Sequence, residues 1–470
     1  MFTLSRSHFR QFRAVLRRAG LAKQLGGFGQ RLLLISLGNR CVLRAMSEGV
    51  AVELSVQLSC EPGHVALPLE VLTACEARSD DPVTIRRSPA DQVLVEWTDQ
   101  QIPQQRQYDF DAGDDLPSFP ARSEQLAENE PSLWFALRDA IASAEQSRTR
   151  YALDCIQLRG EQGQIIATDG RQVLRQSGFH FPWTDDVLVS ALPVLGCREL
   201  SSNSPVQIGR DEDWVTLAVG DWTIALKIEK ELRFPRVDSI FPPQSAIASR
   251  MHLAETDAGF LTSALPKLPS REQLNAPVTV ELNGHVAIRS RGEEQTQATE
   301  LLLANSRLEG SPITWQTNRD FLARAVKLGF REICLSDPRA PAMCEDARRQ
   351  FIWALLEPQG AIPASADTLR IESPVAGPTP RASRSRAPRS STRMSRPQNQ
   401  QHDSVKADHS ESESSTITAL IDDAEALRAT LRDATAKLST LIAGLKRQRK
   451  QTRLMRSTLQ SLKALQAIDA

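Results

Sequence analysis

The sequence predicts an α+β protein in which three similar modules follow one another and a different C-terminal extension comes after them. Segments with helix-like apolar periodicity begin near residues 8, 133 and 258, so the pattern repeats after roughly 125 residues. Runs that alternate apolar and polar residues, such as VLVEW, VTVEL and HVAIRS, are typical of antiparallel strands. We therefore expect helices on one face of antiparallel sheets. The expected modules are 1–122, 128–245 and 250–358.

A second helix is expected in each module. The segments PLEVLTACEAR near residue 68, SALPVLGCREL near residue 190 and NRDFLARAVKLG near residue 318 carry this signal. In the middle module, IIATDGRQVLRQ at 165–176 places Asp-Gly between two strand-like runs, which predicts a tight hairpin. Each module thus has the expected order helix, strands, helix, strands.

The C-terminal extension has a different composition. Residues 361–415 are rich in Pro, Ser and Arg and poor in large apolar residues, so they cannot bury enough surface to offset their ordering entropy and we expect a disordered linker. Between 416 and 468, apolar residues recur in an a/d heptad pattern that favours a helix or coiled coil. This helix either packs on the modules or associates with a second copy or a partner helix.

Charge is distributed unevenly, although the formal net charge is zero. Residues 361–470 hold 18 Lys and Arg against 11 Asp and Glu, which leaves 39 against 46 in residues 1–360. Any nucleic-acid contact of the acidic modules must therefore be a local basic patch, because bulk attraction is absent.

Cysteine usage and the lack of long apolar runs indicate a cellular location. The seven cysteines form no C-x-x-C pair and mostly lie in apolar contexts, which is typical of reduced, buried thiols in a cytosolic protein. The segment MFTLSRSHFRQFR lacks the apolar core of a signal peptide. No run approaches the roughly 18 apolar residues of a transmembrane helix. We expect a cytoplasmic protein without a membrane partner.

Sequence signatures of catalysis are missing. The chain contains no G-x-x-x-x-G-K-[ST], G-x-S-x-G or H-E-x-x-H motif. GGFG at 26–29 follows a helix-like segment and lacks dinucleotide-binding spacing, so we interpret it as a loop. The seven histidines have no metal-ligand spacing. The sequence thus predicts no catalytic residue, no metal site and no cofactor.

The middle module carries a family resemblance. The segments RYALDCIQLRGEQGQIIATDGRQVLRQ (150–176), VQIGRDEDWVTLAVGDWTIALKI and RFPRVDSIFP (233–242) resemble the bacterial DNA sliding clamp, the beta subunit of DNA polymerase III. Its most recognisable pieces are the Thr-Asp-Gly-basic hairpin and the later Phe-Pro element that ends in a second Pro. In weaker form the resemblance extends over about residues 1–358.

The resemblance implies three tandem DNA-clamp domains per subunit and a homodimeric, head-to-tail ring. Helices would line the hole and sheets would form the outside, so that double-stranded DNA is encircled without sequence preference. The replicative DNA polymerase and the clamp loader would bind a hydrophobic peptide cleft. Such a protein is grouped with DNA-directed DNA polymerase but catalyses nothing. The alternative is a clamp-fold scaffold that no longer encircles DNA and works through its cleft and coiled-coil tail.

Basic residues on the predicted helices suit a DNA-facing lining. Four arginines between residues 6 and 17 recur at spacings of four, three and four, which makes one basic stripe on an amphipathic helix. Such a stripe in isolation is usually a solvated face. The segment 68–78 carries Glu70 and Glu76, so the lining is thinner there. The expected DNA contacts are Arg6, Arg10, Arg13, Arg17, Arg138, Arg148, Arg150, Tyr151, Arg324 and Lys327.

Two further surfaces follow from the resemblance. The peptide cleft would lie between the second and third modules, and the subunit contact would join an edge strand of the first module to one of the third. The cleft would be lined by Leu153, Thr168, Gly170, Arg171, Val173, Pro242, Ala354, Leu355 and Leu356. The subunit contact would use Arg106, Tyr108 and Phe110 on one side and Leu265, Leu268, Glu293 and Glu294 on the other.

Overall fold

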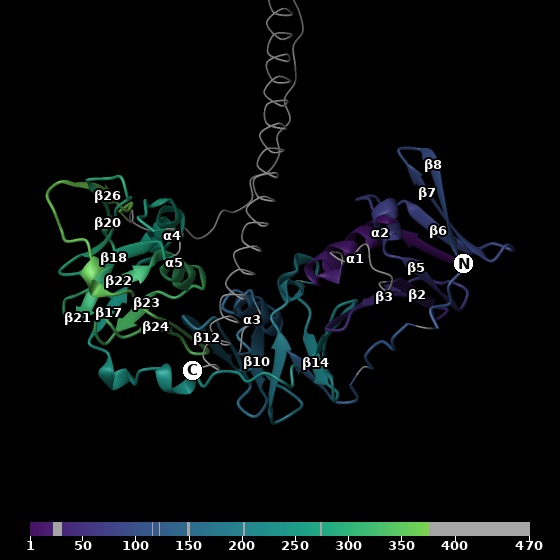
Figure 1. Ribbon diagram of the computed structural model, residues 1–470, viewed down its shortest axis with the longest axis horizontal. Helices are drawn as coiled ribbons and strands as arrows, with labels where there is room; N and C mark the ends of the chain where they lie inside the picture. Colours follow the sequence, from purple (N-terminus) through teal and green to yellow (C-terminus); the bar gives the residue numbers. More distant parts are fainter. Residues whose placement is uncertain are drawn as a thin grey trace, which may run out of the picture. The chain divides into compact units, whose positions relative to one another are not determined.

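The computed structural model describes residues 1–21, 31–114, 116–121, 123–147, 151–200, 203–272 and 275–375 (Figure 1). These residues belong to one compact unit, Met1–Arg381. The predicted coiled coil at 416–468 and most of the predicted linker lie outside the described residues. No helix in the described ranges has both the length and the apolar character that a membrane span requires.

The first module starts with a strand and a well-capped helix. Ser5 caps helix α1: its hydroxyl accepts a hydrogen bond from the His8 backbone N–H, and the His8 ring accepts one from the Ser5 backbone N–H. Phe9, Phe12 and Leu16 on one side of α1 are buried. The elements are β1 (Phe2–Ser5), α1 (Arg6–Arg18), β2 (Arg31–Ser36), β3 (Arg40–Met46), β4 (Val50–Gln57), β5 (Gly63–Pro68), α2 (Glu70–Cys75), β6 (Pro82–Arg87), β7 (Gln92–Asp99) and β8 (Ile102–Asp109).

The second module repeats this order with one difference. Its second helical segment is not an α-helix, because Pro193 and Gly196 interrupt it, and two short 3-10 turns replace the helix expected near residue 190. The elements are β9 (Leu126–Asn129), α3 (Ser132–Ile141), β10 (Cys155–Arg159), β11 (Gln164–Thr168), β12 (Gln172–Ser177), β13 (Asp186–Ser190), η2 (Pro193–Gly196), η3 (Arg198–Leu200), β14 (Val206–Arg210), β15 (Trp214–Val219) and β16 (Trp222–Lys227).

The third module has the same order again and gains two strands. A segment with the 3-10 turns η4 (Asp238–Ile240) and η5 (Gln244–Ala246) leads into it. The elements are β17 (Ser249–His252), α4 (Glu255–Ala264), η6 (Leu265–Lys267), β18 (Pro277–Leu282), β19 (Val286–Ser290), β20 (Ala298–Leu303), β21 (Arg307–Gly310), β22 (Ile313–Asn318), α5 (Arg319–Lys327), β23 (Glu332–Leu335), β24 (Ala342–Glu345), β25 (Arg349–Trp353), η7 (Pro358–Gly360) and β26 (Thr368–Glu372).

Strand order shows the repeat directly. The first sheet of the three modules runs β5-β2-β3-β4, β13-β10-β11-β12 and β22-β18-β19-β20. The second sheet runs β1-β6-β7-β8, β9-β14-β15-β16 and β17-β23-β24-β25. In each module the two helical elements contact one another: α1 with α2, α3 with η2, and α4 with α5. The predicted α+β class with repeated helices and antiparallel sheets is confirmed.

Neighbouring modules are joined by sheet continuation. β4 of the first module pairs antiparallel with β16 of the second, and β12 of the second pairs antiparallel with β25 of the third. Phe12 of α1 stacks on Trp222 of β16 with ring centroids 6.1 Å apart, so the first joint is also packed from the helix side. These joints make continuous sheets across both module boundaries.

Residues 361–375 correct the predicted start of the disordered linker. β26 pairs parallel with β20 and becomes the fifth strand of the third module's first sheet (Figure 1). The average composition of 361–415 hides this strand, because its order comes from pairing with a distant sheet edge and not from its own apolar content.

The cysteines agree with the sequence-based expectation. All seven lie in described ranges, none forms a disulfide, and all but Cys60 are buried. Burial raises the pKa of Cys41 and of Cys75 to about 12, so these thiols stay protonated and unreactive near neutral pH.

Candidate nucleic-acid and partner-binding surfaces

Helix α1 presents a basic face to solvent. Arg10 and Arg17 are exposed, as predicted from the stripe, and Arg18 beside them is exposed as well. Arg13 is half-buried, and its Nη1 lies 2.6 Å from Glu76 Oε1 of the segment after α2. The exposed cations of α1 are therefore Arg10, Arg17 and Arg18.

Two predicted DNA contacts are structural instead. Arg6 is 5% exposed and donates from Nε to the Cys75 carbonyl (3.0 Å) and from Nη1 to the Thr98 carbonyl (2.7 Å). Arg324 donates from Nη2 to the Asp139 carbonyl at 2.6 Å, which fastens α5 to the end of α3. Both guanidinium groups are engaged in holding elements together, which corrects their prediction as DNA contacts.

The remaining predicted DNA contacts come from the second and third modules. Arg138 on α3 and Lys327 at the end of α5 are exposed, and Tyr151 is 51% exposed. Arg198 on η3 adds an exposed cation. The predicted contacts Arg148 and Arg150 lie outside the described residues. Exposed cations therefore occur on helical elements of all three modules, which suits sequence-independent contacts with phosphates.

The Asp-Gly hairpin is built by side-chain hydrogen bonds within the turn. Thr168 Oγ1 donates to the Gln172 carbonyl (2.6 Å) and accepts from the Gly170 N–H (3.0 Å). Asp169 Oδ1 accepts from the N–H of Arg171 (2.8 Å) and of Gln172 (3.0 Å). Gly170 has φ +86°, a conformation that favours glycine. These bonds fix the turn and leave the Arg171 side chain exposed.

The structure brings four of the predicted cleft residues together: Leu153, Gly170, Arg171 and Ala354. The Ala354 N–H donates to the Arg171 carbonyl at 2.8 Å, so the end of β25 meets the hairpin. A Cβ added at Gly170 would lie 3.8 Å from Leu153 Cδ1. Ala354 is exposed, whereas Leu153, Pro242, Leu355 and Leu356 are partly buried.

Two predicted cleft residues do not line a surface. Thr168 is 2% exposed and serves the turn, and Val173 is 3% exposed and packs in a small apolar cluster with Val237 and Ile352. β12 and β25 pair here, so Val173 lies opposite Ile352 inside a continuous sheet. The two paired strands lie far apart in the sequence, so the hairpin sequence alone does not show this pairing.

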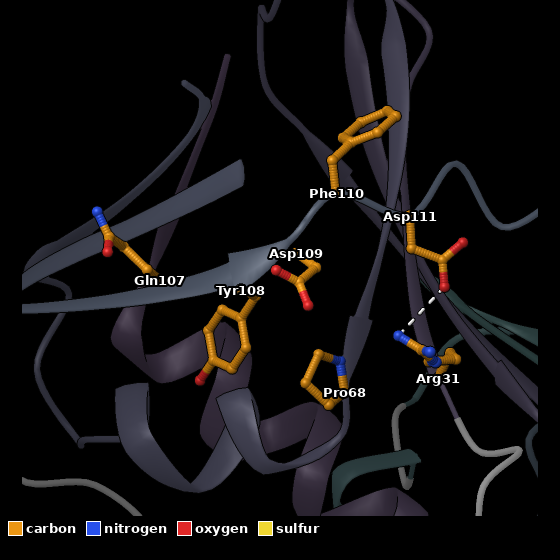
Figure 2. Close-up of a pocket in the computed structure, with 7 residues that line it drawn as sticks. All are labelled: Arg31, Pro68, Gln107, Tyr108, Asp109, Phe110 and Asp111. Atoms are coloured by element: carbon orange, nitrogen blue, oxygen red, sulfur yellow. Dashed lines mark ion pairs between the residues drawn. The ribbon is translucent and has the colours of Figure 1, made fainter. Parts of the chain in front are cut away.

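The predicted subunit contact of the first module lies on an edge strand. In the described part of the chain, β8 ends its sheet, and Arg106 on it is exposed while Tyr108 and Phe110 are partly buried. A pocket of about 520 Å³ lies at the end of β8. Figure 2 shows Tyr108 at one side of it and the Arg31–Asp111 ion pair at the other. Arg31 Nη1 lies 3.1 Å from Asp111 Oδ2. This pocket is lined by Arg31, Pro68, Gln107, Tyr108, Asp109, Phe110 and Asp111.

The third-module side of the predicted contact needs correction. Leu265 is 0% and Leu268 6% exposed, and both belong to the core of the third module, so they are not available to a second subunit. Glu293 and Glu294 are exposed in the turn that leads from β19 to β20. Glu293 and Glu294 stay a prediction for the subunit contact, whereas Leu265 and Leu268 face the core.

Comparison with solved structures identifies the fold. The beta subunit of DNA polymerase III from Pseudomonas aeruginosa matches with a TM-score of 0.63 at 18% identity, over 76% of this chain and 99% of that one. The corresponding subunit from Borrelia burgdorferi matches with a TM-score of 0.63 at 10% identity, over 76% and 99%. The chain has the fold of a bacterial DNA sliding clamp. A putative beta subunit from Eubacterium rectale shares this clamp fold at 13% identity, with a TM-score of 0.63 over 75% and 98%.

Two comparisons at the level of sequence do not find this relationship. No protein-family profile matches the chain, and no curated protein matches it. The clamp fold is therefore shared at sequence identities of only 10–18%. The resemblance inferred from the hairpin and the Phe-Pro element is confirmed at the level of the fold.

Proposed function

We propose that this chain is a clamp-like processivity factor of the cytoplasm, of which two copies form a head-to-tail ring around duplex DNA. The observation that carries the proposal is the clamp fold, which spans 99% of the Pseudomonas aeruginosa subunit. A closed ring holds DNA by topology, so it needs neither base contacts nor catalysis. The exposed cations on α1, α3, η3 and α5 supply the mild positive potential that such a ring needs.

The hairpin and the end of β25 form the proposed partner site. Leu153, Gly170, Arg171 and Ala354 come from two modules and meet at one place. The predicted cleft residues Pro242, Leu355 and Leu356 are partly buried, and Arg171 is exposed. This combination suits an extended peptide with an apolar anchor from a replicative polymerase or a clamp loader.

Retention on closed DNA tests the ring. The full chain is loaded on nicked circular DNA with a clamp loader and then passed through a sizing column. We expect co-elution with the circle and loss of co-elution after the DNA is linearised, because a ring slides off a free end. Equal retention on both forms contradicts the ring.

Charge reversal on α1 is the first mutational prediction. Replacing Arg10, Arg17 and Arg18 by Glu removes up to three phosphate contacts, so the slope of log K against log salt falls in magnitude by about 3. Fluorescence anisotropy with labelled duplex DNA between low and moderate salt measures this slope. The matched control is Arg40→Glu, which reverses the charge of an exposed residue on strand β3. We expect this control to leave the slope unchanged. An unchanged slope in the triple variant would remove α1 from the DNA-facing surface.

One observation favours the scaffold alternative. β26 pairs with the outer edge of β20, which would otherwise be the last strand of the third module's first sheet. If that strand is permanent, the ring cannot close there and the chain acts as an adaptor through its partner site. The retention experiment decides between the two.

A further inference from the structure

The two internal joints define a rule for module contact. In each, the fourth strand of one module's first sheet pairs antiparallel with the last strand of the next module's second sheet: β4 with β16, and β12 with β25. Applied once more, the rule pairs β20, the fourth strand of the third module's first sheet, with β8, the last strand of the first module's second sheet. Within one chain this third joint does not form among the described residues. β20 therefore fits the β8 edge of a second copy of this chain.

The β20 edge is already occupied. β26 pairs with it in parallel, from Ala298 opposite Thr368 to Leu302 opposite Glu372, which covers five of the six residues of β20. β26 belongs to the strap, by which we mean residues 356–375. The strap and an incoming β8 would need the same backbone groups of β20, so they exclude one another.

The beginning of the strap crosses the third module's first sheet on its polar face. The Leu356 N–H donates to the Gln316 carbonyl (2.8 Å) and Gln316 Nε2 donates to the Gly360 carbonyl (2.7 Å). The Ile362 N–H then donates to Thr279 Oγ1 at 2.8 Å. The strap thus starts at β22 on one edge of the sheet and ends on β20 at the other.

The end of the strap is held by charge and hydrogen bonds. Arg370 Nε lies 2.7 Å from Glu300 Oε1 on β20. Ser373 Oγ donates to Asp257 Oδ1 at 2.6 Å, and the Ser373 N–H donates to the Leu302 carbonyl at 2.9 Å. Arg370 lies opposite Glu300 at the edge of β20 that an incoming strand would pair with.

β26 contributes little apolar burial. Leu369 and Ile371, its two large apolar residues, are 55% and 42% exposed. Its attachment therefore rests on backbone pairing, one half-exposed ion pair and its terminal hydrogen bonds. Segments with few buried apolar contacts open more readily than the core, and parallel pairing is slightly weaker per residue than antiparallel pairing.

We propose that the strap is a removable cap on the subunit edge: β26 keeps β20 from pairing with β8 of a second copy, and ring closure requires its release. This inference rests on the proposed function, because it takes the second copy as the partner. Capping lowers the apparent affinity between copies by the fraction of molecules in which β20 is uncovered. Any factor that displaces the strap then allows the ring to close.

A locked and a released variant test the proposal in the full chain. Thr299→Cys with Leu369→Cys places two cysteines at paired positions of β20 and β26, where a disulfide closes the cap on oxidation. Arg370→Glu with Ile371→Pro opposes Glu300 and breaks β26 pairing. Arg307→Glu, an exposed arginine on β21, controls for charge. Hydrogen exchange of residues 102–109 reports β8 pairing and is insensitive to association through the tail.

We expect residues 102–109 to become protected from hydrogen exchange as the protein concentration rises. In the released variant this protection should begin at a protein concentration at least tenfold lower than in wild type or Arg307→Glu. The oxidised locked variant should show none, and reduction should restore wild-type behaviour. The proposal fails if the oxidised form protects β8 as well as wild type does. It also fails if the released variant leaves β8 unprotected, or if residues 368–372 stay protected in that variant.

The same variants separate this inference from the proposed function. If the oxidised locked variant is retained on circular DNA as well as wild type is, the cap is wrong and the ring stands. If the released variant protects β8 yet is lost equally from circular and linear DNA, the cap stands and encirclement is wrong.

Discussion

Replacing Arg289 by Met is expected to destabilise the protein by about 3–5 kcal/mol, because it leaves a buried carboxylate without its main partner. Arg289 is 1% and Glu300 2% exposed, and Arg289 Nε lies 2.6 Å from Glu300 Oε2. Its Nη1 also pairs with Glu281 on β18. After the substitution Arg370 is the one ion-pair partner that Glu300 keeps in the described ranges, and its side chain is 57% exposed and therefore well screened.

Urea unfolding followed by tryptophan fluorescence measures this cost. The matched control is Arg370→Met, which removes the exposed partner of the same carboxylate and is expected to cost about 0–1 kcal/mol. Burial raises the pKa of Glu300, but the hydrogen bonds from Arg289 and Arg370 outweigh burial and hold that pKa below its ordinary value. A loss under about 1 kcal/mol for Arg289→Met would mean that water reaches Glu300 in the folded protein.

The buried ion pair belongs to a row of polar residues that crosses the whole sheet. Gln316, Thr279, Arg289, Glu300 and Arg370 are opposite one another in successive strands from β22 to β26. Thr279, Arg289 and Glu300 are each at most 2% exposed. A polar row stays satisfied at this depth because its members bond one another and the strap.

Local sequence signals predicted local structure well. The 3.6-residue spacing of Phe9, Phe12 and Leu16 placed α1, and all three side chains are buried. The same spacing placed Arg6 with Arg10 on one basic stripe. Arg6 is nevertheless buried, because the end of α2 and the end of β7 close over it through the Cys75 and Thr98 carbonyls. Those partners lie far along the chain, where helical periodicity carries no information.

The sequence did not predict the contacts between modules. The pairing of β12 with β25 buries Val173, although the hairpin pattern gives it the same status as its exposed neighbour Arg171. β26 was missed for a related reason: TLRIE is a short strand inside a Pro- and Ser-rich stretch, and only the open β20 edge gives it a partner. Edge pairing depends on the backbone of both strands, and composition describes only one of them.

Asp257→Ala is the second large expected effect, at about 3–4 kcal/mol, because several donors lose one buried acceptor. Asp257 on α4 is 0% exposed. Its Oδ2 accepts from Ser306 Oγ (2.6 Å) and from the Asn305 N–H (3.0 Å), and its Oδ1 accepts from Asn305 Nδ2 (2.8 Å) and from Ser373 Oγ (2.6 Å). Chemical denaturation at pH 7 measures the loss, with Ser263→Ala on the same helix as an exposed control.

The Asp257 carboxylate also gives this stability a pH dependence of known sign. Burial raises its pKa, but the hydrogen bonds from Ser306, Ser373 and Asn305 outweigh burial and hold the pKa below the ordinary value of about 3.9. A depressed folded-state pKa contributes stability that is complete above that ordinary value and is lost as pH falls through the folded-state pKa. The difference between wild type and Asp257→Asn should therefore be constant from pH 7 to about 5 and shrink below about pH 4. A difference that grows on acidification would show that Asp257 is protonated in the native state, and the strap would then be held by a neutral acid.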